Sequence, residues 1–542
     1  MNIFADKCFK NPIEIITAFD CDTFKNALFK IEKLSKTHYL LGYIRYEAKD
    51  IFLGKNIISK LPLLYFEVYD GYSKFDSKCD KNIFLFPRQS ISMEEYVSDI
   101  NAIKNYISSG DTYEVNYTYD WDVVHPFDGF ELYKSLLLFQ KTPYNAYIKN
   151  EYEEVLSFSP ELFFEIKDNK IFTKPMKGTI KRGENEIEDA ANIEFLKNDI
   201  KNRAENVMIV DLLRNDLSKI AKTGTVNVPK LFDIESHSTL HQMTSEVTAE
   251  IRDGISLYDI FEAIFPCGSI TGAPKIRTME IIDELEHGSR NIYCGAIGLI
   301  TPEKMTFSVP IRILQRTAGS DEFKYRVGGA VVWDSDAYNE WEETIVKTSF
   351  LCANHCNLKL IETIKVENGE AFLYNEHIDR MRTSAGKLNF LFPDTLPAIP
   401  ENFNGILRFL LSKNGELEVI QKELTQLPFE SVKISPVIVN SQSEFLYHKT
   451  TYRPYYENID EIFFNEKGEL TENSIANIIL EVNGRLYTPP LECGLLNGIY
   501  RTKLLRDGKI QEKKLYMEDL VAADAIYLAN SVRGMWRVKL CL

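Results

Sequence analysis

The 542-residue chain lacks the features that would assign it to a membrane, an export route or a nucleic-acid partner. No run approaches the roughly 18 apolar residues of a membrane span, and the N-terminus lacks a basic segment followed by an apolar one. We therefore expect a cytoplasmic protein with no membrane partner. The net charge is −16 and no basic patch stands out, which argues against nucleic acid. Small anionic substrates remain possible, because a few local cations and backbone amides can bind them.

Paired Cys-x-x-Cys segments are also missing, and so are repeats and low-complexity tracts. The nine cysteines are scattered and odd in number, as is typical of reduced thiols. Cys352 and Cys356 are close together, but no second ligand pair has the spacing of a zinc site. The composition is that of a globular protein, and the length favours more than one folding unit.

The chain changes character after Phe350, where Leu-Cys-Ala-Asn-His-Cys-Asn leads into a strand predicted over 358–366. We place a boundary there and expect two domains, residues 1–355 and 356–542. Alternating apolar residues predict strands at 40–46, 63–69 and 161–166, and helical spacing predicts helices at 93–108 and 198–221. Since strands and helices occur in clusters, we expect an α+β fold rather than a doubly wound sheet.

Three glutamates of the first half stand in unusual surroundings. Glu205 shares a face of the predicted helix 198–221 with apolar residues, and a buried carboxylate needs a cation. Glu340 and Glu343 have i, i+3 spacing and repel each other on one helical face unless solvent or a metal separates them. Such glutamates suit magnesium, which prefers oxygen ligands. Spacing alone fits a solvated face equally well.

Several segments of the first half occur in an order that resembles the chorismate-utilising enzyme family. They are SFSPELFF (157–164), TKPMKGT (173–179), AENVMIVDLLRNDL (204–217), FPCGSITGAPKIRTMEIIDELE (265–286), YCGAIG (293–298), VPIRIL (309–314) and RVGGAVVWDSDAYNEWEET (326–344). The resemblance implies large β-sheet layers with flanking helices and chorismate as the substrate.

The same resemblance implies roles for individual residues. Glu205 and Glu343 would be Mg²⁺ ligands, with Glu340 bound through water, and the metal would hold a chorismate carboxylate. Glu161 would be the acid that helps the ring hydroxyl depart. Expected substrate-binding residues are Lys275, Thr271, Gly272, Arg312, Gly328 and Gly329.

Lys177 distinguishes the reactions of this family. Anthranilate synthases generally carry Ala at this position, whereas members that aminate carbon 4 carry Lys in Pro-Ile-Lys-Gly-Thr, which 175–179 reproduces with Met for Ile. The resemblance implies that Lys177 attacks ring carbon 2 and expels the 4-hydroxyl, after which ammonia enters at carbon 4 and expels the lysine. For this role we expect desolvation or neighbouring charge to lower the pKa of Lys177.

No glutaminase-like motif with a glycine-flanked cysteine nucleophile occurs in the sequence. If the first half aminates chorismate, the ammonia must come from elsewhere. We therefore expect a separate glutamine amidotransferase subunit as partner.

The second half resembles fold-type-IV pyridoxal-phosphate enzymes, a group that includes aminodeoxychorismate lyases and branched-chain aminotransferases. The resemblance lies in LKLIETIKVENGEAFLYNEHIDRMRTSAGKLNF (358–390) and HKTTYR (448–453). It implies an α+β domain that binds pyridoxal 5′-phosphate. Lys449 would hold the cofactor covalently, and Glu472 would pair with its pyridine nitrogen. The expected phosphate-binding residues are Arg380, Gly498, Ile499, Asn530 and Ser531.

Together the resemblances imply two consecutive reactions, amination of chorismate and then elimination of pyruvate to give p-aminobenzoate. The alternatives are anthranilate synthesis in the first half and amino-acid transamination in the second. A further alternative is a silent binding or scaffolding protein.

Overall fold

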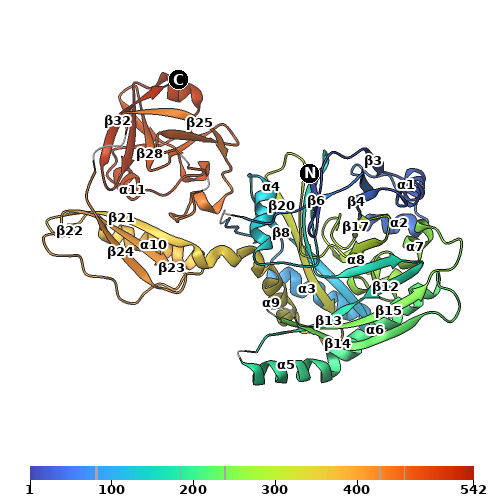
Figure 1. Cartoon of the computed structure of the whole chain (residues 1–542). Coiled ribbons are helices and arrows are strands. Elements are labelled where there is room, and N and C mark those ends of the chain that lie inside the picture. The colour runs from blue at the N-terminus through green and yellow to red at the C-terminus, as the bar shows by residue number, and fades with distance from the viewer. Residues whose placement is uncertain are drawn as a thin grey trace. The chain divides into compact units, whose positions relative to one another are not determined.

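The computed structural model describes residues 1–79, 83–183, 185–236, 240–425, 429–453, 455–456 and 458–541. The chain divides into two compact units, Met1–Leu351 and Cys352–Leu542 (Figure 1). The division falls inside the 3₁₀ helix η3 (Ser349–Asn357), slightly before the boundary at 355 that the sequence predicts. No helix in the described ranges is long and apolar enough to cross a membrane.

Unit 1 contains two large antiparallel sheets, which confirms the α+β fold class. The first sheet has the order β16 (Gly272–Ala273), β8 (Glu114–Val124), β20 (Glu322–Val331), β19 (Ile313–Thr317), β10 (Glu153–Ser159), β9 (Tyr144–Lys149), β1 (Asn2–Phe4), β2 (Lys7–Phe9) and β6 (Ser73–Lys74), with β7 (Arg88–Gln89) on β8.

Lys177 lies on β13 (Met176–Lys181), the first strand of the second sheet of unit 1. The order of this sheet is β13, β15 (Leu240–Glu250), β12 (Lys170–Lys174), β11 (Leu162–Lys167), β18 (Met305–Ser308), β17 (Ala296–Ile300), β4 (Tyr39–Ile44), β5 (Leu64–Tyr69) and β3 (Glu14–Ala18), with β14 (Asn227–Ser236) on β15.

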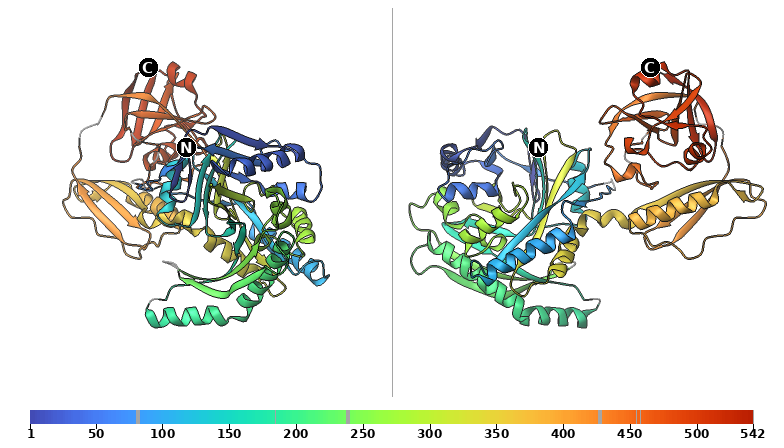
Figure 2. Two further views of the ribbon diagram at one scale, coloured as in Figure 1. Left: turned by 45° about the vertical axis from the view of Figure 1, so that its right-hand side comes forward. Right: turned by 180° about the vertical axis from the view of Figure 1, so that it is seen from behind.

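Helices flank these sheets, as Figures 1 and 2 show. The α-helices are α1 (Cys21–Leu34), α2 (Lys49–Phe52), α3 (Met93–Ser108), α4 (Gly129–Leu137), α5 (Glu186–Asn198), α6 (Ile200–Ser218), α7 (Leu257–Ile264), α8 (Lys275–Leu285) and α9 (Ala337–Thr348). Short 3₁₀ turns are η1 (Tyr46–Ala48) and η2 (Gly268–Ile270).

Two helices show how the sequence specifies these elements. Helix α3 has the predicted bounds, because Ser92 and Glu95 form a capping box at its start and its buried residues follow helical spacing. Helix α6 begins after the N-cap Asp199 and buries Ile209, Leu213 and Leu217 on one face. This face fixes the helix against the core and positions Glu205 near its first turns.

Unit 2 combines a small sheet with a closed one. The small sheet has the order β22 (Glu370–Ala371), β21 (Lys359–Glu367), β23 (Gly405–Ser412) and β24 (Leu417–Lys422), and α10 (Tyr374–Lys387) packs on it (Figure 1). Lys413, Asn414 and Gly415 lie in the turn between β23 and β24.

The larger sheet of unit 2 closes on itself, because β27 pairs with both β26 and β28. Its order is β27 (Leu470–Asn473), β26 (Glu461–Asn465), β25 (Ser431–Val439), β32 (Gly534–Cys541), β31 (Ala525–Asn530), β28 (Ala476–Val482), β29 (Arg485–Thr488) and β30 (Gln511–Glu512). The helical segments η4 (Glu444–Leu446), η5 (Leu491–Cys493), α11 (Ile499–Arg506) and α12 (Met517–Ala522) complete the unit.

Candidate active sites

Strand β8 brings the predicted substrate-binding glycines of unit 1 to one stretch of backbone. Its first residues, 114–118, pair with Gly272 on one side and with Gly328 and Gly329 on the other. A Cβ at Gly272 or Gly328 would lie 1.9 or 1.8 Å from a carbonyl oxygen of β8, so a side chain cannot be accommodated at either position. The glycines therefore allow three strands to approach closely beside the candidate site.

Thr271 lies between the same strand and η2. Its carbonyl accepts a hydrogen bond of 2.8 Å from the backbone N–H of Asn116. Its hydroxyl donates to the carbonyls of Cys267 and Gly268, at 3.3 and 3.2 Å. These contacts shape the segment before Gly272.

Lys177 lies on β13 and contacts a buried carboxylate that the sequence analysis did not single out. Its Nζ is 3.0 Å from Oε1 of Glu114, which also accepts from Nδ2 of Asn116 at 3.1 Å. Glu114 is fully buried. Little in the sequence signals its role, since Glu114 begins a strand that also contains Asn116, Thr118 and Asp120.

The electrostatics of Lys177 differ from the expectation. Burial alone would lower its pKa, but the carboxylates of Glu114, Glu205 and Glu161 outweigh burial and raise it. The predicted lowering is therefore wrong for this state of the site, because sequence spacing gave no information on the acids that surround the amine. Lys177 rests as an ammonium ion.

Glu161 is buried and immediately precedes β11. The hydroxyl of Ser269 donates to its Oε1 at 2.6 Å. Burial raises the pKa of Glu161 to about 7, although Ser269 and Lys177 act in the opposite direction. A carboxyl group with this pKa carries a proton for part of the time at neutral pH and can act as an acid.

Glu205 and Glu340 are held close enough to influence each other. Burial raises the pKa of Glu205, and the negative charges of Glu114 and Glu340 add to that effect. Burial also raises the pKa of Glu340, with Glu343 adding to it, even though Ser335 donates to its carboxylate at 2.8 Å. Lys177 and Lys201 oppose the shift at Glu205, and Lys201 and Lys347 oppose it at Glu340. Buried carboxylate oxygens of this kind fit a hard divalent cation.

Glu343 is instead paired with a lysine on its own helix. Its Oε1 lies 2.7 Å from Nζ of Lys347, and its side chain is 55% exposed. Lys347 also donates to the carbonyl of Gly328 at 2.9 Å, which ties α9 to β20. Within the described ranges, no three acidic, His or Cys side chains form a ready-made metal cluster.

The remaining predicted cations of unit 1 have their contacts elsewhere. Lys275 forms an ion pair with buried Asp216 and donates to the carbonyl of Ile264. Arg312 adopts a left-handed backbone with φ of 56° and has no side-chain hydrogen bond or ion pair to any described residue. Burial lowers the pKa of Arg312. An unpaired, partly buried guanidinium of this kind suits a carboxylate ligand.

In unit 2, Lys449 follows η4 and has one acid and several cations near it. Its Nζ lies 3.3 Å from the Thr363 hydroxyl. Burial lowers its pKa to about 7; Glu362 opposes this shift, whereas Arg380, Arg453 and Arg408 promote it. A substantial fraction of this amine is neutral at pH 7, as condensation with an aldehyde requires.

Glu472, on β27, accepts hydrogen bonds on both carboxylate oxygens. Tyr456 donates to Oε1 at 2.9 Å and Asn477 to Oε2 at 3.1 Å. Burial raises its pKa to about 7, while Arg453 and Tyr456 lower it. These two hydrogen bonds fix the carboxylate in the same hollow that Lys449 lines.

Arg380 reaches from α10 toward the start of α11. It contacts both oxygens of Glu362, at 2.8 and 2.7 Å, and donates to the carbonyl of Asn497 at 2.9 Å. His377 lies 2.6 Å from the same carboxylate. Burial would raise the pKa of Glu362, but Arg380 and His377 outweigh burial and lower it far below the usual range. Glu362 thus orients a predicted phosphate ligand.

The predicted phosphate-binding residues lie around one hollow. Gly498 caps α11, and a Cβ there would lie 1.8 Å from Oδ1 of Asn477. The Asn530 side chain accepts from the backbone N–H groups of Val532 and Arg533, at 3.1 and 2.9 Å, which shapes the turn after β31. The hollow is lined by Arg380, Lys449, Arg453, Glu472, Asn473, Ile475, Ala476, Asn477, Leu496, Gly498, Ile499, Ala529, Asn530 and Ser531.

This arrangement fits pyridoxal phosphate by the chemistry of its donors. A poorly protonated lysine, a carboxylate and a glycine at a helix N-terminus share one hollow. Arg408, which the sequence analysis missed, pairs in register with Thr363, and its Nε is buried without a partner among the described residues. Its guanidinium is available to an anionic ligand beside Lys449.

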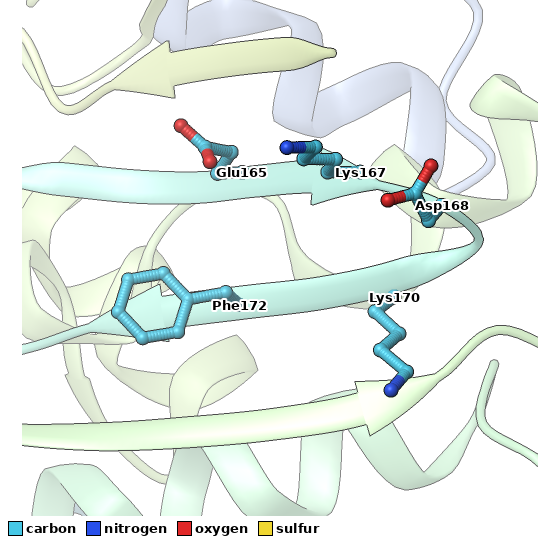
Figure 3. Close-up of a pocket in the computed structure, with 5 residues that line it drawn as sticks. All are labelled: Glu165, Lys167, Asp168, Lys170 and Phe172. Carbon is cyan, nitrogen blue, oxygen red and sulfur yellow. The ribbon is translucent and has the colours of Figure 1, made fainter. Parts of the chain in front are cut away.

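A further hollow lies on the β11–β12 hairpin of unit 1. Figure 3 shows its lining residues, Glu165, Lys167, Asp168, Lys170 and Phe172. Glu165 is already paired with Lys304 at 2.6 Å. None of the residues predicted to bind substrate or metal lines this hollow, so we do not assign it to the site.

Known proteins show similarity to both halves. Residues 80–353 match the chorismate binding enzyme family, and residues 359–541 match amino-transferase class IV. Aminodeoxychorismate synthase component 1 of Klebsiella aerogenes is 40% identical over 263 residues, covering 48% of this chain and 58% of that protein. Anthranilate synthase component 1 of Aquifex aeolicus is 35% identical over 265 residues, covering 49% of this chain and 53% of that protein. The chain thus spans somewhat more than half the length of these relatives.

A solved structure shows the same fold as the first half. The crystal structure of anthranilate synthase component I from Streptococcus pneumoniae TIGR4 aligns with a TM-score of 0.56 at 22% identity, covering 65% of this chain and 92% of that chain. At this identity the likeness concerns the fold alone. Because the family match to residues 80–353 covers just over half of the sequence, the chain belongs to the chorismate binding enzyme family, with an amino-transferase class IV domain after it.

Proposed function

We propose that this chain makes p-aminobenzoate from chorismate in two consecutive reactions, one in each unit. The first replaces the 4-hydroxyl of chorismate by an amine, and the second eliminates pyruvate from the aminodeoxychorismate formed. The observation that carries the proposal is Lys177 itself, a buried amine in direct contact with Glu114 and surrounded by acids. A lysine at this position can form a bond to carbon 2, whereas an alanine cannot.

Each residue of the first site has a defined task. Lys177 attacks ring carbon 2, and Glu161 protonates the departing hydroxyl, consistent with its pKa of about 7. Ammonia then bonds to carbon 4 and Lys177 leaves. Arg312 holds a substrate carboxylate, while Gly272, Gly328 and Gly329 allow the backbone to approach it.

Glu205 and Glu340 are the residues that we assign to a magnesium ion, with Glu343 joining them when it separates from Lys347. When bound beside these glutamates, the ion supplies the positive charge that attracts a chorismate carboxylate. Lys275 is tied to Asp216, so we assign it to the support of α6 and α8 rather than to direct contact.

The second site provides a base and an electron-withdrawing environment. Pyridoxal phosphate, when bound, supplies the electron sink. Lys449 would hold the cofactor and would then move the proton from ring carbon 4, and Glu472 would pair with the pyridine nitrogen. Arg380, Gly498, Ile499, Asn530 and Ser531 surround the phosphate end. Arg408 holds a carboxylate of the substrate.

Ammonia reaches the first site from a separate glutamine amidotransferase. Relatives that match the first half are named component 1, which supports a partner that supplies the second component. The motif for a built-in glutaminase is missing from the sequence. We place both proteins in the cytoplasm, where chorismate is available to them.

The test is a product assay with the full chain, chorismate, ammonium, magnesium and pyridoxal phosphate. We expect p-aminobenzoate and pyruvate in equal amounts, identified by mass and by fluorescence. Anthranilate would contradict the first half of the proposal. Aminodeoxychorismate without pyruvate, or exchange of amino groups between amino and keto acids, would contradict the second.

A further inference from the structure

Glu114 makes the one polar contact of the Lys177 amine within the described parts of the chain. The two residues come from different sheets, Glu114 from the start of β8 and Lys177 from β13. The carboxylate is fully buried, and the lysine side chain is 11% exposed. The pair is therefore well shielded from water.

We propose that Glu114 is the base of the first reaction, taking the proton from the Lys177 ammonium and so exposing the lone pair that attacks chorismate. This inference rests on the proposed function and deepens it, because it adds the residue that converts a resting ammonium into a nucleophile. Glu114 touches the reacting nitrogen and is therefore a catalytic residue in this account.

The two carboxylate oxygens of Glu114 have different surroundings. Its Oε1 accepts from Lys177 and Asn116, but its Oε2 is buried with no partner among the described residues. Oε2 therefore has lone pairs that no described donor occupies, at which a proton can be accepted. The backbone of Glu114 is fixed because Gly272 packs against its carbonyl.

The other nearby acids are less suitable. Glu161 is bonded to Ser269 and its pKa of about 7 leaves it protonated for part of the time, as its role of acid requires. Glu205 faces Lys201 at 4.0 Å and belongs to the metal-binding wall. Neither has a hydrogen bond to Lys177 Nζ.

The charges around Lys177 make a base necessary. Glu114 from β8, Glu205 from α6, Glu161 before β11 and Glu343 from α9 all interact with it electrostatically. Lys177 forms an ion pair of 3.0 Å with Glu114, and an ammonium ion in such a pair has no lone pair, so it cannot attack until a proton leaves.

The proton balance closes over one turnover. Glu114 takes a proton from Lys177, the amine forms a bond to carbon 2, the ring π electrons shift toward carbon 4, and the C4–O bond breaks as Glu161 protonates the hydroxyl. Ammonia then bonds to carbon 4, the π electrons shift back, and the C2–N bond breaks to release neutral Lys177. The new C4 ammonium returns a proton to Glu161, and Glu114 returns its proton to Lys177. The net change is chorismate plus ammonia to aminodeoxychorismate plus water.

The first test is Glu114→Gln, which preserves size and can still accept a hydrogen bond from Lys177 but cannot take a proton. We expect the rate of chorismate consumption at pH 7 to fall by about 10² to 10⁴-fold, the usual contribution of a general base, with little change in the chorismate KM. The rate should recover at high pH, where hydroxide deprotonates Lys177. An unchanged rate and pH profile would overturn the proposal.

The second test is Glu114→Ala with added formate. It distinguishes a carboxylate that acts as a base from one that only balances the charge of Lys177. We expect formate to restore part of the chorismate-consuming activity, and larger carboxylates to restore less. Loss of activity in both variants, with neither high-pH recovery nor formate rescue, would identify Glu114 as a structural partner of Lys177 and overturn the proposal. The wild-type product assay is independent of these variants, so failure of the proposed function would be seen there first.

Discussion

The two units each bury a lysine, and the two lysines differ in the sign of their pKa shift. Burial acts on both in the same direction, toward the neutral amine. In unit 1 the carboxylates around Lys177 outweigh burial and keep it charged. In unit 2 burial lowers the pKa of Lys449 to about 7; Glu362 opposes this shift, and the cations Arg380, Arg453 and Arg408 add to it.

The difference shows that burial does not by itself make a lysine a nucleophile. Lys449 must meet an aldehyde as a neutral amine, so neighbouring cations prepare it in advance. Lys177 must wait for its substrate, and its acids keep it protonated until Glu114 accepts the proton. The charged side chains around each lysine therefore determine when its amine becomes reactive.

The largest effect should come from Lys449→Ala. We expect p-aminobenzoate formation to fall by at least about a thousandfold, as on loss of other covalent catalysts, while aminodeoxychorismate accumulates. The fold should survive, because the change removes a costly buried amine. Product analysis by mass checks this, with exposed Lys467→Ala as control. Normal p-aminobenzoate output from Lys449→Ala would refute the role of this lysine.

Lys177→Ala should abolish the first reaction to a similar extent and leave the second intact. We expect no aminodeoxychorismate from chorismate, but normal p-aminobenzoate when aminodeoxychorismate is supplied. Lys181→Ala, on the exposed end of the same strand, is the matched control. Wild-type output from Lys177→Ala would remove this residue from the mechanism, and anthranilate would show that ammonia can enter at carbon 2 directly.

A smaller loss should follow removal of the metal. We expect a chelator, or Glu205→Gln, to slow chorismate consumption by about 100-fold or more, since altered metal surroundings alone cost about 10 to 100-fold. The second reaction should be unaffected. Magnesium titration by calorimetry checks the binding directly, with Glu342→Gln, between Glu340 and Glu343 on α9, as control. Chorismate consumption that resists the chelator would mean that the carboxylates are not metal ligands.

The smallest effects concern pH, where the two units should respond in opposite directions. Glu161 acts as an acid with a pKa of about 7, so chorismate consumption should decline as pH rises through 7. Neutral Lys449 increases over the same range, so uptake of pyridoxal phosphate by cofactor-free protein should accelerate. We expect changes of up to about tenfold per pH unit in each rate. Profiles that run in parallel would contradict the assignment of one of the two groups.

The sequence predicted most of the local structure because the relevant signals are local. The capping box at Ser92 and Glu95 sets the start of α3, and the turn at residues 465–468 joins β26 and β27 into a hairpin. The α+β class could be predicted because the predicted strands and helices occur in clusters along the sequence. The closure of the second sheet through β27 and β28 was not predictable, because it depends on pairing between distant strands.

Local patterns could not identify the partners of the site residues. Glu114 lies 63 positions from Lys177 in sequence, and Arg408 shares no motif with Lys449. Their significance comes from strands that meet in space, so neither was predicted. Asp216, which pairs with Lys275, was also missed because α6 and α8 meet only in the folded chain, whereas Lys347 lies at i+4 from Glu343 on α9 and could have been found from spacing alone.

Reductive trapping tests the contrast between the lysines most directly. The full chain is mixed with pyridoxal phosphate near pH 7 and treated with borohydride, and the modified residue is located by peptide mass spectrometry. The account predicts one cofactor per chain, attached to Lys449, with Lys177 unmodified because its acids keep it protonated. Attachment at Lys177, or an unmodified Lys449, would contradict it.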